Sequence, residues 1–97
     1  IDIDPGSIVD ASANVKNSIF KDNIEVFETD VLAYQPNCTF DAILSNPPFF
    51  IHALPSPHAH KNQSKHIDAT FVYSFLNKAH TLLKDNGRLS IWVAADT

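Results

Sequence analysis

Four consecutive residues near the middle of the chain, Asn46-Pro47-Pro48-Phe49, have the chemistry to hold an amino group. Pro47 restrains Asn46 to an extended backbone and Pro48 does the same to Pro47, so this segment cannot wind into a helix. Because neither proline has an N–H, the carbonyl of Pro47 is left for a ligand, and the Asn46 amide adds a second acceptor oxygen. Two acceptors match the two N–H donors of an exocyclic amine or of a side-chain amide.

This arrangement favours transfer of a methyl group to nitrogen. The lone pair of an exocyclic amine is delocalised into its ring, so the nitrogen is a poor nucleophile. Two acceptors draw the hydrogens out of the plane and hold the nitrogen in line with a methyl donor, by positioning and electrostatics more than by proton abstraction. Phe49 and Phe50 are candidates to stack on a base lifted out of its strand, and we expect one of them to lie in the core.

The elements that position this motif alternate between strands and helices. Clusters of apolar residues followed by turn residues predict strands at residues 1–3, 24–28, 40–45 and 88–94. Helical spacing predicts one helix that begins at Asp4-Pro5 and includes Ile8 and Ile19, and a second over residues 69–83 that Asp85-Asn86-Gly87 stops. Residues 52–65 contain two prolines and no periodicity, which indicates a loop. The order predicts an α/β layer with a mostly parallel sheet.

Three polar residues fall at or just past the ends of these strands. These residues are Asp2, Asp30 and Asn46. In open parallel sheets, ligands bind beyond the carboxyl ends of the strands. We therefore expect the three side chains to line one edge of the sheet.

In this setting the chain resembles the Rossmann-like class I amino-methyltransferases that use S-adenosylmethionine. Asn46-Pro47-Pro48-Phe49 after an apolar strand looks like the fourth motif of that family, and both earlier acidic strand ends look like the motifs before it. The resemblance implies that Asp2 holds the ribose hydroxyls of the cofactor and that Asp30 accepts from its adenine amine. It also implies that Ile3 and Val31 cover the two faces of the adenine ring. Asn46 is expected to contact both cofactor and substrate.

The segment from Leu44 to Phe50, with Lys65-His66 downstream, is most similar to the bacterial tRNA1(Val) adenine-N6 methyltransferases. This resemblance implies methyl transfer to N6 of an adenosine in tRNA, in the cytoplasm, with Asn46, Pro47, Pro48 and Phe49 at the reacting centre. The same resemblance implies that Phe49 stacks on the target base. The residues expected to contact RNA are Phe49, Phe50, Lys61, Lys65 and His66. Methylation of a release-factor glutamine, methylation of DNA adenine and an inactive cofactor-binding fragment remain alternatives.

The chain departs from the family pattern at both ends. The glycine-rich first motif is absent, because neither Gly6 nor Gly87 is placed for that role, and no further strands follow residue 94. The first residue is Ile1 rather than Met. We therefore interpret residues 1–97 as the central part of one methyltransferase domain, without its first strand-helix unit and its last strands.

Charge and composition limit the partners. The net charge is −4, yet it is divided unevenly: two lysines stand against eight acidic residues through Asn46, and five basic residues against three acidic ones after it. The basic half follows the motif, which favours an RNA-facing segment there.

No apolar run approaches the roughly 20 residues of a membrane span. Cys38 is the single cysteine, so an internal disulfide is excluded, and we expect its thiol to be buried. The histidines His52, His58, His60 and His66 have no accompanying Cys or carboxylate within the loop, so no metal is predicted; the oligomeric state is left open.

Overall fold

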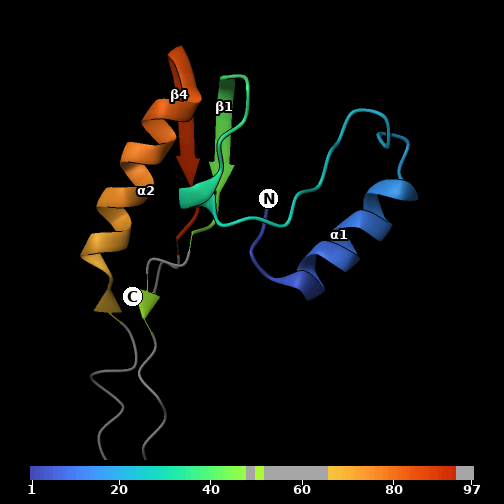
Figure 1. Ribbon diagram of the computed structural model, residues 1–97, viewed down its shortest axis with the longest axis horizontal. Helices are drawn as coiled ribbons and strands as arrows, with labels where there is room; N and C mark the ends of the chain where they lie inside the picture. Colours follow the sequence, from blue (N-terminus) through green and yellow to red (C-terminus); the bar gives the residue numbers. More distant parts are fainter. Residues whose placement is uncertain (48–49, 52–65, 94–97) are drawn as a thin grey trace, which may run out of the picture. The chain divides into compact units, whose positions relative to one another are not determined.

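The structure is a computed structural model that describes residues 1–47, 50–51 and 66–93 (Figure 1). The chain divides into two compact units, Ile1–Pro36 and Asn37–Thr97, and each is described by itself. The predicted loop over residues 52–65 lies outside the described residues, and with it the predicted roles of Lys61 and Lys65.

The first unit begins with helix α1, Pro5–Lys16. Asp4 caps it: its Oδ2 accepts from the Ser7 N–H and from the Ser7 hydroxyl, each at 2.8 Å. Pro5 occupies the first helical position, where its missing N–H costs nothing. The hydrogen bond from the Ser7 hydroxyl, then that from the Ser7 N–H, lowers the pKa of Asp4, so this carboxylate stays ionised at neutral pH and supports the helix until the pH falls through its folded-state pKa.

The carboxyl end of α1 differs from the sequence prediction. The helix ends at Lys16, and Ile19 lies beyond it with 91% of its surface exposed. The Ser18 N–H donates to the Val15 carbonyl, and the Ser18 hydroxyl accepts from the Phe20 N–H at 2.9 Å. These local bonds replace the helical pattern, as serine side chains commonly do outside helix interiors.

The two strands predicted at residues 1–3 and 24–28 are present as one parallel bridge between Asp2 and Glu28. The Asp2 N–H donates to the Phe27 carbonyl at 3.2 Å, and the Thr29 N–H donates to the Asp2 carbonyl at 2.9 Å. The predicted parallel direction is confirmed. The predicted lengths are wrong, because apolar composition does not by itself provide the neighbouring strands that extend a ladder.

The second unit contains two parallel strands, β1 (Phe40–Ser45) and β4 (Leu83–Ile91), whose arrows run the same way in Figure 1. β1 has the predicted bounds. β4 begins earlier than the predicted residue 88, and its register shifts between the pairs Phe40↔Leu83 and Ala42↔Arg88. From there the pairing is regular through Ser45↔Ile91.

Helix α2, Ala69–Leu82, precedes β4 and contacts it. Asp68 caps the helix by accepting from the Phe71 N–H at 3.2 Å. The predicted stop at residues 85–87 is wrong, because Leu83 already has the extended φ and ψ of −89° and 144°. Asn86 instead lies within β4, where the register with β1 shifts, and has a φ of 67°.

One stripe of α2 forms the core of the second unit. Phe75, Ala79 and Leu82 are 2%, 3% and 8% exposed, at the spacing of one helical face. The rings of Phe71 and Phe75 stack with centroids 6.0 Å apart. Leu76, predicted to be core, is 41% exposed because it follows Phe75 by a rotation of about 100° around the helix.

Two short strands border the predicted loop. β2 (Phe50–Ile51) pairs antiparallel with β3 (His66–Ile67), in the register Phe50↔Ile67 and Ile51↔His66. Cys38, predicted to be buried, is an exposed free thiol because it lies in the bend before β1. In the part of the chain that the structure describes, no helix is long and apolar enough to cross a membrane.

Candidate functional site

The acidic half of the predicted site lies in the first unit, around the bridge between Asp2 and Glu28. The Asp2 carboxylate is exposed, and its Oδ1 accepts from the Asp4 N–H at 2.8 Å. No donor among the described residues contacts its Oδ2. Asp4 uses its Oδ2 for the cap of α1, where this oxygen accepts both hydrogen bonds from Ser7. The Asp2 carboxylate caps no helix, and its Oδ2 is left for an outside hydroxyl.

Asp30 follows the other strand of the bridge by two residues. Its side chain caps the short 3-10 helix η1, Val31–Ala33, by accepting from the Leu32 N–H at 2.9 Å. The Thr29 N–H, one residue before Asp30, is bonded to the Asp2 carbonyl. The structure thus brings the Asp2 and Asp30 segments to the same end of one parallel pair, as the sequence predicts. Ile3 is 66% exposed and Val31 is half-buried.

The amide half of the predicted site lies in the second unit, at the end of β1. Asn46 follows Ser45 directly and is exposed, and Pro47 is half-buried. The Ser45 carbonyl accepts from the Trp92 N–H at 2.8 Å, so the chain beyond β4 runs beside Asn46. Pro48 and Phe49 lie outside the described residues. The predicted meeting of Asn46 with Asp2 and Asp30 stays a prediction, because they belong to different units.

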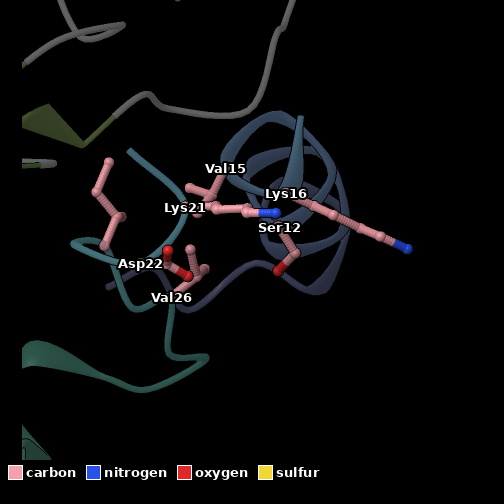
Figure 2. A pocket seen from close by; sticks show the side chains of 7 residues that line it. Ser12, Val15, Lys16, Lys21, Asp22 and Val26 are labelled. Carbon is pink, nitrogen blue, oxygen red and sulfur yellow. The ribbon is translucent and has the colours of Figure 1, made fainter. Parts of the chain in front are cut away.

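A hollow in the first unit does not coincide with either half. It has a volume of about 450 Å³ and lies between the carboxyl half of α1 and residues 21–26 (Figure 2). None of the predicted cofactor residues lines it, and the Lys16 side chain points away from the other lining residues in Figure 2. Its lining residues are Ser12, Val15, Lys16, Lys21, Asp22, Ile24 and Val26. We therefore place no ligand there.

Two of the predicted RNA-contacting residues lie within the described part. Phe50 and His66, sixteen positions apart, belong to the adjacent strands β2 and β3. The sequence pattern of these segments did not predict this pairing. Across residues 1–47, 50–51 and 66–93, no three His, Cys, Asp or Glu side chains gather as a metal site.

In both units, parallel strands are followed by polar residues at their carboxyl ends, which is the position where α/β proteins bind ligands. The methyltransferase small domain family matches residues 1–96, and the chain belongs to this family. Its α/β architecture is that of a partial Rossmann-like methyltransferase.

Several bacterial proteins are similar to this chain, and each is named tRNA1(Val) (adenine(37)-N6)-methyltransferase. The protein of Bacteroides thetaiotaomicron is 35% identical over 99% of this chain and 40% of its own length. That of Parabacteroides distasonis is 33% identical over 94% of this chain and 39% of its own length. That of Pedobacter heparinus is 31% identical over 91% of this chain and 38% of its own length. The chain thus spans about 40% of the length of these relatives. A comparison with solved structures found no match.

Proposed function

We propose that the full-length protein transfers a methyl group from S-adenosylmethionine to N6 of an adenosine in tRNA, in the cytoplasm. Residues 1–97 are the central part of its single methyltransferase domain. The observation that carries this proposal is the position of the exposed Asn46 and of Pro47 directly after a parallel strand, in a chain of the methyltransferase small domain family. The names of the relatives support tRNA adenine as the substrate.

The acidic half fits the cofactor. A ribose presents two hydroxyl donors, and the Asp2 carboxylate has one oxygen without a donor among the described residues and a second that can accept again. Asp30 offers its remaining oxygen to the adenine amine, while Ile3 and Val31 present apolar surface to the ring. Bound there, S-adenosylmethionine supplies an electrophilic methyl group on a sulfonium.

The amide half orients the nucleophile. The Asn46 side-chain oxygen and the Pro47 carbonyl accept hydrogen bonds from the two N–H groups of the adenine amine, which orients the nitrogen lone pair. The nitrogen would take the methyl group that S-adenosylmethionine supplies and would release one proton to solvent. Phe49 stacks on the lifted base, and Phe50, Lys61, Lys65 and His66 contact the RNA around it.

We expect Asp2→Ala to weaken S-adenosylmethionine binding by about 1–3 kcal/mol, because a charged acceptor of the ribose is lost. Isothermal titration of the full-length protein measures this. Asp2→Asn is the informative partner, since its oxygen can still accept from the Asp4 N–H and keep the local turn while the charge is gone. Asp10→Ala, an exposed acid on α1, is the control. An unchanged dissociation constant in both Asp2 variants would show that this carboxylate does not hold the cofactor.

The substrate is tested by labelling. The full-length protein, incubated with methyl-labelled S-adenosylmethionine and tRNA, is expected to yield N6-methyladenosine after digestion to nucleosides and mass spectrometry. Activity should fall steeply with salt, and Lys61→Ala with Lys65→Ala should flatten the logarithmic salt slope by up to about 2. Lys16→Ala with Lys21→Ala, an equal loss of charge in the first unit, should leave the slope unchanged. Label found in a release-factor glutamine and not in tRNA would establish the rival substrate.

A further inference from the structure

The exposure of side chains along β1 and β4 distinguishes the two faces of this strand pair. Ile43 and Ser45 of β1 are half-buried, as are their register partners Leu89 and Ile91 of β4. The residues between them point the other way. Leu44 is 70% exposed, and its register partner Ser90 is also exposed. One face of the pair is therefore open in the described residues, and Leu44 lies on it.

One further pair of residues continues this open face past the ends of both strands. In a parallel ladder, a residue whose N–H bonds to the carbonyl of residue i−1 lies opposite residue i. The Trp92 N–H donates to the Ser45 carbonyl at 2.8 Å, so Trp92 lies opposite Asn46. Adjacent strands are about 4.8 Å apart, and register partners share a face. Asn46 and Trp92 thus lie side by side on the face of Leu44.

Pro47 makes this pair the last one. The Trp92 carbonyl would next accept from the N–H of residue 47, and proline has none. The ladder therefore ends at Pro47, because proline has no N–H to donate. The carbonyl of Pro47 is the second proposed acceptor. The Trp92 side chain, which belongs to the same face as that of Asn46, is 68% exposed.

We propose that the indole of Trp92 forms an aromatic wall of the acceptor site and stacks on the base whose amine Asn46 holds. This inference rests on the proposed function and deepens it, because it selects a planar nucleobase over a glutamine side chain. A base has a π-face that an indole can cover, and such stacking stabilises binding whatever the base. A glutamine amide has no ring to cover, so an exposed tryptophan beside the acceptor adds little to its binding.

The first test compares three variants of the full-length protein. Trp92→Ala should lower kcat/KM for tRNA by about 5- to 150-fold, the range for loss of one base–aromatic stack, with the larger part in KM. Trp92→Phe keeps a ring face and should recover most of this loss. Leu44→Ala is the matched control, since Leu44 is as exposed and lies on the same face one register pair earlier along it. S-adenosylmethionine affinity should be unchanged in all three.

The second test uses fluorescence, since Trp92 is the one tryptophan in these 97 residues. An adenosine-containing anticodon-loop oligonucleotide should quench the emission of the wild-type protein, and Trp92→Phe should remove that quenching. Wild-type methylation of tRNA together with unchanged kcat/KM in Trp92→Ala would overturn this inference alone. Equal losses of activity and stability in Trp92→Ala and Leu44→Ala would also overturn it, since the face would then be packed by protein. Methylation of glutamine by the wild type would instead refute the proposed function.

Discussion

Replacement of Asn46 by alanine is expected to lower the methylation rate of the full-length protein by about 100-fold or more. This loss corresponds to an activation free energy that is higher by at least about 2.7 kcal/mol. The change removes one of the two proposed acceptors of the amine, and it leaves the Pro47 carbonyl in place. Single-turnover transfer of labelled methyl to tRNA measures the effect. The dissociation constant of S-adenosylmethionine, from isothermal titration, should stay within about twofold, because the proposed role of the amide is mainly in holding the substrate.

The position of Asn46 in the structure indicates that this substitution has little effect on stability. Asn46 is exposed, and no hydrogen bond of its side chain occurs with the described residues, so its truncation leaves no buried polar group unpaired. Exposed substitutions of this kind change stability by about 0.5 kcal/mol or less. Asn37→Ala, an exposed asparagine before β1 with no proposed role, is the matched control. A loss of less than about tenfold in Asn46→Ala would show that the amide does not orient the amine.

Replacement of Phe75 by alanine should reduce the free energy of unfolding by about 3–5 kcal/mol, the cost of removing a buried aromatic ring. Phe75 is 2% exposed at the centre of the α2 stripe, and its ring stacks on Phe71. A loss of this size is a large fraction of the stability of an ordinary domain. Chemical denaturation of the full-length protein, followed by circular dichroism, measures it.

Tyr73 provides the control on the same helix. It is 72% exposed, so Tyr73→Ala should change stability by about 0.5 kcal/mol or less. Phe75→Leu keeps most of the buried apolar surface and should cost less than Phe75→Ala. If Phe75→Ala and Tyr73→Ala cost the same small amount, α2 does not form the core described here.

The sequence by itself determined the elements whose signals are local. Asp4-Pro5 marks the start of α1 because a cap and a fixed φ act within one turn, and β1 has its predicted bounds because Pro47 and Pro48 cannot continue a ladder. α2 begins at the predicted Ala69 and ends one residue before the predicted end, since a helical stripe is read from spacing alone. The acidic and amide candidates followed from these strand ends.

Only the tertiary structure decided which strands pair and for how long. Two predicted strands were reduced to the bridge at Asp2 and Glu28, and β4 began at Leu83 through a shifted register with Phe40. The pairing of β2 with β3 joined residues 15 and 17 positions apart, and the position of Trp92 beside Asn46 joined residues 46 positions apart. Such contacts depend on hydrogen bonds between distant segments, whose register no local pattern of side chains specifies.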